Sequence, residues 1–222
     1  DSCIDIIIPR GSKDLIKAIK EKSSIPVIKH SDGICHIYID GDANLTKAKK
    51  IVYNSKMRQP SICGAAETLL IDKRLSNHTI EILSELKEAN CEIRGDQFIS
   101  QLDESFKLAT AKDWDTEYLD KIISVKIVNG VDEATEHINK HSSHHTESII
   151  TENEKTSHKF FQHVNSAIVL QNASTQFADG GEFGFGAEIG ISTNKLHVRG
   201  PVGAEHLTSF KYVVRGNGQV RP

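Results

Sequence analysis

The chain has 222 residues, of which 38% are hydrophobic and 26% are charged, and its formal net charge is −3. This composition is typical of a soluble chain with one or two ordinary domains, and no stretch is apolar over the length needed to cross a bilayer. A net charge close to zero, without a dense stripe of lysine and arginine, argues against nucleic acid as a partner and favours small-molecule chemistry.

The first residues have the pattern of a βαβ unit. We expect a strand over residues 4–8, a helix over 13–22 and a second strand over 26–28, because apolar residues cluster in the strands and recur on one face of the helix. The turn between the first two elements contains Arg10 and Gly11. It could aim backbone N–H groups at a phosphate, although a plain strand-to-helix turn explains a single glycine equally well.

The rest of the chain alternates between strand and helix periods, which predicts an α/β fold. We expect further strands over residues 35–39, 69–71, 91–93, 124–128, 148–150, 167–170 and 207–214. Helices are expected from just after Asp42 or Asn44 to about residue 56, and over about 77–89, 132–140 and 153–164. Pro60 should stop the first of these helices, which leaves Cys63 on a connecting loop.

Cys63 is surrounded by small residues in the segment PSICGAAETLLI, residues 60–71. A thiol is an intrinsically strong nucleophile, and it gains thiolate character when it lies at a helix N-terminus. A cysteine beside alanines is also a common small buried hydrophobe. Both interpretations stay open from this segment alone.

The remaining cysteines and the histidines do not predict a metal site. The cysteines are scattered without close pairs, so we expect reduced thiols and a cytoplasmic protein. His137 and His141 are spaced to share one helix face, with His144 and His145 just beyond them. Because no acidic or cysteine ligand joins them in a motif, we favour a solvated helix end over a metal.

Several blocks of sequence occur in the order typical of one family. They are SIPVI (24–28), GICHIYID (33–40), the segment around Cys63, NASTQFADGG (172–181), FGFGAEIGIST (183–193) and KLHVRGP (195–201). Together they resemble the gamma-glutamyl phosphate reductases, also called glutamate-5-semialdehyde dehydrogenases, which are members of the aldehyde dehydrogenase superfamily. Chains of that family are about twice as long, and the present sequence resembles their C-terminal half.

The resemblance implies a division of the chain into three parts. Residues 1–32 would be the end of a Rossmann-like dinucleotide-binding domain, residues 33–203 a three-layer catalytic domain with a parallel sheet, and residues 204–222 an oligomerisation strand and tail. A homo-oligomer is therefore expected. Since the N-terminal half of the family is missing, a separate N-terminal-half chain is an expected partner, as is a glutamate kinase.

The resemblance also implies a reaction, the NADPH-dependent reduction of gamma-glutamyl phosphate to glutamate-5-semialdehyde and phosphate in proline biosynthesis. Cys63 would attack the acyl phosphate and form a thioester, which then accepts a hydride. Oxidising aldehyde dehydrogenases commonly have a glutamate that activates water in a Glu-Leu-Gly-Gly stretch. Here residues 29–33 read KHSDG without a glutamate, which fits a thioester that must not be hydrolysed. His30 is a candidate acid or base, or an ordinary surface histidine.

Further site residues follow from the same resemblance. The candidate substrate ligands are Arg58, Asn172, Ser174, Thr175, Lys195, His197 and Arg199. Ordinary solvation or loop hydrogen bonding is the alternative for all of them. The candidate cofactor-binding residues are Arg10, Gly11 and Glu117, the last because it falls near the superfamily glutamate that contacts the nicotinamide ribose. The N–H of Cys63 would donate to the oxyanion, which is worth roughly 3 kcal/mol of barrier.

A second hypothesis is a folded but inactive relative that retains only oligomerisation or ligand binding. The presence of Cys63 favours the enzyme, whereas the missing dinucleotide-binding half favours the inactive relative.

Overall fold

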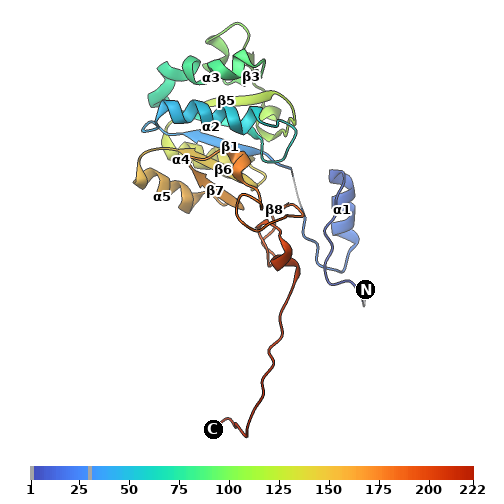
Figure 1. Ribbon diagram of the computed structural model, residues 1–222. Coiled ribbons are helices and arrows are strands. Elements are labelled where there is room, and N and C mark those ends of the chain that lie inside the picture. Colours follow the sequence, from blue (N-terminus) through green and yellow to red (C-terminus); the bar gives the residue numbers. More distant parts are fainter. Residues whose placement is uncertain (1–2, 30–31) are drawn as a thin grey trace.

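The computed structural model describes residues 3–29 and 32–222, so the candidate His30 lies outside the described residues. The main body is a parallel sheet with helices packed on both faces (Figure 1). The α/β class and the three-layer arrangement expected from the sequence are confirmed.

The main sheet has seven strands in the order β4-β3-β5-β2-β1-β6-β7, and all its neighbouring pairs are parallel. The strands are β1 Cys35–Ile39, β2 Ala66–Asp72, β3 Glu92–Gly95, β4 Lys107–Leu108, β5 Ile122–Val128, β6 Thr146–Ile150 and β7 Ile168–Gln171. The central strands β1 and β2 are buried along their whole length, as expected of parallel strands covered on both faces. Residues that precede parallel strands share one edge of the sheet, and Cys63 lies there, just before β2.

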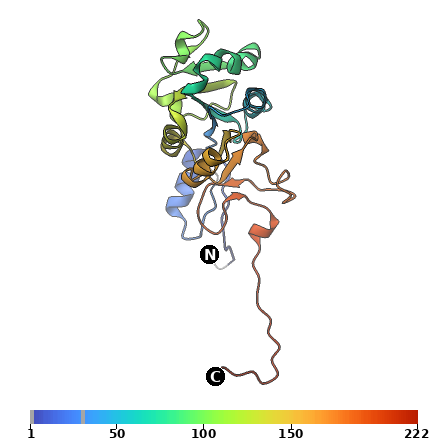
Figure 2. The same cartoon turned by 90° about the vertical axis from the view of Figure 1, so that its left-hand side faces the viewer.

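Helices α2 (Leu45–Met57) and α3 (Thr79–Glu88) cover one face of the sheet, and α4 (Gly130–His141) and α5 (Glu154–His163) cover the other (Figure 2). Successive residues of β1 point to opposite faces. Ile37 and Ile39 therefore pack with α2 and α3, whereas Tyr38 packs with α4 and α5. Short 3-10 helices complete the connections: η1 Lys73–His78, η2 Ile99–Gln101, η3 Ala111–Asp115, η4 Thr175–Phe177 and η5 Ala204–Leu207.

Helix α2 determines where the loop with Cys63 begins. The side chain of Asn44 accepts the backbone N–H of Lys47 and so caps the helix N-terminus. The helix ends at Met57, shortly before Pro60, which cannot continue it. Turns and bends over residues 60–65 then lead into β2. The sequence predicted this loop correctly.

The N-terminal segment contains helix α1 (Lys13–Lys22), which stands apart from the main sheet (Figure 1). The two strands expected around it are reduced to a single parallel bridge between Ile7 and Val27. Ile28 packs with Val198 and Val202, so this segment is tied to the C-terminal part of the chain.

The C-terminal segment forms a small antiparallel pair, β8 (Ile191–Ser192) with β9 (Gly200–Pro201). The strand predicted over residues 207–214 is wrong for the described chain, because residues 208–222 have no regular structure and lead away from the body (Figure 1). Phe210, Tyr212 and Val214 are 78%, 85% and 87% exposed. A strand requires a neighbour for its backbone hydrogen bonds, and this tail lies beside no sheet edge.

The other predicted strands and helices are confirmed to within a few residues. Within residues 3–29 and 32–222, none of the helices has the length and apolar character required to cross a membrane.

Candidate active site

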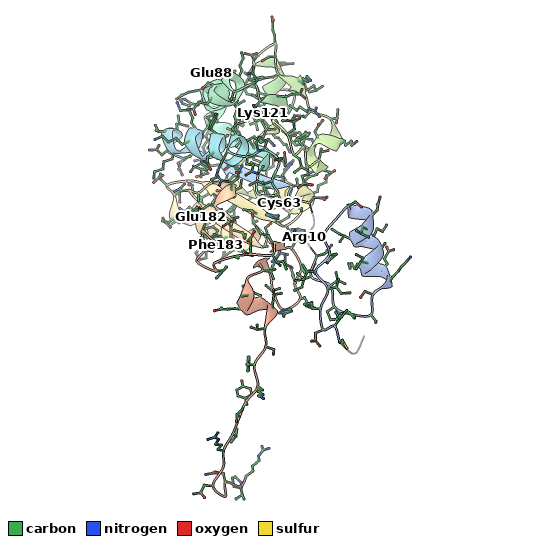
Figure 3. The ribbon with its side chains drawn as sticks, turned by 45° about the vertical axis from the view of Figure 1, so that its right-hand side comes forward. Arg10, Cys63, Glu88, Lys121, Glu182 and Phe183 are labelled. Carbon is green, nitrogen blue, oxygen red and sulfur yellow. The ribbon has the colours of Figure 1, made fainter. Side chains whose placement is uncertain are left out.

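Cys63 opens into a cavity of about 570 Å³ at the amino end of β2. The cavity lies between α2 with the following loop and the segment that runs from Asn172 to Ile191. Its polar lining comprises Asn54, Arg58, Asn172, Ser174, Gln176, Asp179, Glu182 and Glu188. Figure 3 shows Cys63, Arg10 and the segment of Glu182 and Phe183 on the same side of the molecule, away from Glu88 and Lys121.

Burial, together with nearby carboxylates, keeps the thiol of Cys63 protonated at neutral pH. Burial raises the pKa of Cys63 to about 11, the carboxylates of Glu117 and Glu188 add to this effect, and the positive charge of Arg10 opposes it. The sequence leaves open that Cys63 lies at a helix N-terminus, which would favour its thiolate. Cys63 precedes strand β2 instead, so it does not lie at a helix N-terminus.

The backbone of Cys63 is in close contact with Gly33. A Cβ atom at Gly33 would lie 1.9 Å from the carbonyl oxygen of Cys63, so only glycine fits there. The N–H of Gly33 donates to Oε1 of Glu117 at 2.7 Å, and the Sγ of Cys35 donates to the Cys63 carbonyl at 3.2 Å. The structure thus brings the candidate cofactor residue Glu117 next to the candidate nucleophile.

Among the cationic residues predicted to bind the substrate, Arg58 lies on the wall of this cavity. Its Nη1 donates to Oε1 of Gln176 at 3.3 Å. A guanidinium has five N–H donors, so this bond leaves donors for an anion in the cavity.

Asn172 and Ser174 also line the cavity, but the bonds of their side chains are those of a loop. The amide of Asn172 bonds the backbone N–H and carbonyl of Thr151, at 3.0 and 2.9 Å. Ser174 accepts the N–H of Gln176. Thr175 is completely buried, and its Oγ1 donates to the carbonyl of Gly64 at 2.7 Å. For Thr175 the bonding therefore favours the alternative of loop hydrogen bonding.

The structure does not bring Lys195, His197 and Arg199 together with Cys63. Arg199 donates to the side chain and the carbonyl of Asn165. The ring of His197 contacts the carbonyl of His206, and Lys195 is exposed. These three residues follow the glycine-rich segment, and the sequence pattern alone gave no indication of the distance between them and the thiol.

Arg10 and Gly11 lie where the N-terminal segment meets the glycine-rich segment. A Cβ atom at Gly190 would lie 2.5 Å from Nη2 of Arg10, so the guanidinium rests on the backbone of Gly190. Gly11 has a φ of 142° and is exposed just before α1. This conformation favours glycine and permits the turn into the helix.

The solvated helix end predicted for the histidine cluster is wrong for His137 and His145, which are 6% and 0% exposed. Helix α4 packs on the sheet and places the His137 ring against His36 and Trp114. Burial lowers the pKa of His137 to about 2, so its ring is neutral. Among the described residues, no group of three or more His, Cys, Asp or Glu side chains is arranged to hold a metal ion.

Comparison with known proteins agrees with this geometry, although no family profile matches the chain. A gamma-glutamyl phosphate reductase of Bradyrhizobium diazoefficiens is 55% identical over 223 residues, which cover 100% of this chain and 51% of the relative. The crystal structure of the gamma-glutamyl phosphate reductase of Thermotoga maritima is 44% identical with a TM-score of 0.94, over 100% of this chain and 54% of that chain. The chain belongs to the gamma-glutamyl phosphate reductase family.

The chain spans about half the length of these reductases. Two more distant structures share its fold. An acetylating aldehyde dehydrogenase of Geobacillus thermoglucosidasius is 22% identical with a TM-score of 0.74, over 98% of this chain and 58% of that chain. An engineered glycolyl-CoA reductase with bound NADP+ is 17% identical with a TM-score of 0.67, over 91% of this chain and 54% of that chain.

Two residues of this cavity were missed as site residues by the sequence analysis. Glu188 lines the cavity and raises the pKa of Cys63, and Gln176 binds Arg58. Both lie in blocks that carry the family resemblance. That signal was available, but it could not separate residues that contact the thiol from those that shape the loop.

Proposed function

We propose that this chain supplies the thiol and the substrate cavity of a gamma-glutamyl phosphate reductase. The reaction is the reduction of gamma-glutamyl phosphate to glutamate-5-semialdehyde and phosphate. It is a step of proline biosynthesis, and we place it in the cytoplasm. The observation that carries the proposal is the cavity into which Cys63 opens, walled by Arg58, in a chain 55% identical to a reductase.

The acylation step uses residues of this chain. After losing its proton to water, Sγ of Cys63 attacks the carbonyl carbon of the acyl phosphate. The bond from that carbon to the phosphate oxygen breaks, so phosphate leaves with the bonding electrons and a thioester forms. The N–H of Cys63 donates to the oxyanion during the attack. Arg58 binds an anionic group of the substrate, a role that suits its planar fork of donors.

The hydride for reduction of the thioester is supplied by a nicotinamide cofactor, for which we propose NADPH. Arg10, Gly11 and Glu117 would form only the edge of such a site. One carboxylate oxygen of Glu117 is already occupied, because it accepts the N–H of Gly33. The related fold with bound NADP+ supports this class of cofactor. The remaining contacts would come from the part of the reductase that this chain does not cover.

The proposed partners follow from the reaction, which also requires a dinucleotide-binding half and a source of the acyl phosphate. An N-terminal-half chain would supply the dinucleotide-binding domain, and a glutamate kinase would supply the unstable acyl phosphate. We also propose a homo-oligomer in which the exposed tail, residues 208–222, pairs with a second copy. Its apolar side chains, such as Phe210 and Val214, would then leave water.

The test is phosphate-dependent NADP+ reduction with glutamate-5-semialdehyde, measured on this chain alone and after mixing with the N-terminal half of a family member. Activity only in the mixture is expected, and it should be abolished by Cys63→Ser while the fold is retained. Full activity of Cys63→Ser would overturn the assignment of the nucleophile.

One observation favours the second candidate, a folded fragment that is inactive by itself. A thiol with a pKa of about 11 is almost entirely protonated at neutral pH. Absence of activity in the mixture as well as in the chain alone would support this candidate, and ligand binding or self-association would then be the remaining function.

A further inference from the structure

The turn after β7 holds both ends of the loop that carries Cys63. Oγ1 of Thr175 donates to the carbonyl of Gly64 at 2.7 Å, and the N–H of Thr175 donates to Oγ of Ser55 at 3.0 Å. Gly64 directly follows the nucleophile, and Ser55 lies in the last turn of α2. One residue therefore bridges the end of the helix and the position of the thiol.

Gln176 extends the same connection to Arg58. Its Nε2 donates to the carbonyls of Ser55 and Gln59, at 2.9 and 3.4 Å, while its Oε1 accepts from Arg58. Ser55 and Thr175 are 0% exposed and Gln176 is 8% exposed, so the bonds among these three residues and the bond of Thr175 to Gly64 are shielded from water. Arg58 and Gln59 are exposed, so their bonds to Gln176 are not shielded in the same way. Buried polar groups that lose such a partner cost about 1–3 kcal/mol each. The loop is thus held at several points against a buried turn.

We propose that Thr175 is a positioning residue that sets the Cys63 thiol in its cavity, and that Gln176 sets Arg58 beside it. This inference rests on the proposed function, because positioning matters only if Cys63 is the nucleophile. Thr175 acts through the peptide between Gly64 and Ala65, one residue after the nucleophile, and its hydroxyl bonds that backbone rather than pointing into the cavity. With the hydroxyl removed, the Gly64 carbonyl has no donor there and the turn of Cys63 can move toward water.

The test compares Thr175→Val, which replaces the hydroxyl by a methyl group of similar size, with Thr175→Ser, which keeps the donor. Alkylation by iodoacetamide is followed for each cysteine separately by peptide mass spectrometry, between pH 7 and 9.5. The exposed Cys3 serves as a reference for intrinsic reactivity, and the buried Cys35 and Cys91 report global unfolding.

In Thr175→Val we expect Cys63 to be alkylated about tenfold faster at pH 8. Exposure to water removes the main cause of its raised pKa, and a fall of two pKa units has this effect because the gain in thiolate is partly offset by lower nucleophilicity. Thr175→Ser should match the unmodified chain. Cys35 and Cys91 should remain protected. In the mixture with an N-terminal half, Thr175→Val should lower kcat, so that reactivity and turnover change in opposite directions.

Equal alkylation of Cys63 in Thr175→Val and the unmodified chain would overturn the positioning role. If Thr175→Val does not fold, Ser55→Ala serves instead, because it removes the acceptor of the Thr175 N–H. It is expected to give the same selective increase in the alkylation of Cys63. An unchanged alkylation rate in Ser55→Ala would likewise overturn the positioning role. The alkylation of the chain alone requires no turnover. A mixture without activity would therefore contradict the proposed function and leave the position of the thiol measured independently.

Discussion

Nζ of Lys56 lies 2.6 Å from Oε2 of Glu67, and both side chains are almost completely buried. Lys56 lies in α2 and Glu67 in β2, so this ion pair connects the two elements that flank the loop of Cys63. Glu67 also accepts the N–H of Leu119, and the ammonium lies 5.9 Å from the ring centre of Tyr118. The base of the loop is therefore fixed by charge as well as by packing.

Replacing Lys56 by Met should destabilise the fold by roughly 3–5 kcal/mol at pH 8, because a buried carboxylate loses its counter-ion. Burial already raises the pKa of Glu67 to about 7, while Lys56 opposes that rise. An acid whose folded pKa is raised contributes stability at low pH that is lost as the pH rises through the folded value. The defect of Lys56→Met should therefore be smaller at pH 5, measured by urea unfolding.

The double variant Lys56→Met with Glu67→Gln is the matched control, because it removes both charges. Its stability should lie well above that of Lys56→Met at pH 8. A defect of Lys56→Met that is the same at pH 5 and pH 8 would contradict the role assigned to the Glu67 carboxylate.

Glu117→Gln and Glu188→Gln should each lower the pKa of Cys63, because each removes a negative charge that disfavours the thiolate. We expect alkylation of Cys63 at pH 8 to become a few times faster in either variant. The increase is limited because burial is the largest cause of the raised pKa. Arg10→Met should have the opposite effect. Glu152→Gln, at the ion pair with Lys47, is the control and should leave the rate unchanged.

Gly33→Ala should displace the turn of Cys63, because the added Cβ would lie 1.9 Å from the Cys63 carbonyl oxygen and the backbone must move. We expect a large loss of activity in the mixture with an N-terminal half and a lower melting temperature. Gly203→Ala is the matched control, since its nearest contacts would be at 3.4 Å. Equal melting temperatures for the two variants would refute the close contact.

Arg74→Met should weaken the fold at neutral pH by removing the partner of two buried carboxylates, Asp40 and Asp72. Burial acts to raise the pKa of Asp72, but hydrogen bonds from Arg74 and Tyr38 outweigh it and hold the pKa below its usual range. The stabilisation is therefore present above about pH 4, the usual range of a free carboxyl, and is lost as the pH falls.

The expected cost of Arg74→Met is about 2 kcal/mol at pH 7, below the value for a fully buried pair, because Arg74 is half exposed and solvent screens it. The difference between variant and unmodified chain should shrink at pH 3. Arg215→Met, in the exposed tail, is the control. A difference in stability that stays constant with pH would show that the charge of Arg74 does not stabilise the Asp72 carboxylate.

Much of the fold could be predicted from the sequence, because local patterns determine it. The apolar runs of β1, β2 and β6 and the spacing of apolar residues in α2 and α4 predict buried parallel strands covered by helices. Pro60 predicts the loop of Cys63. The tail over residues 207–214 has an equally strand-like pattern, yet a strand also requires a neighbouring edge, which no local pattern can supply.

The sequence by itself determined the α/β class, the family and the position of Cys63 on a loop, because these depend on periodicity, on Pro60 and on the order of the family's sequence blocks. Only the tertiary structure decided which polar residues meet that cysteine. Gly33, Glu117, Thr175 and Glu188 come from distant parts of the chain, and strand order and helix packing bring them to one edge of the sheet. The same packing leaves Arg199 elsewhere, and burial at that edge gives the thiol its raised pKa.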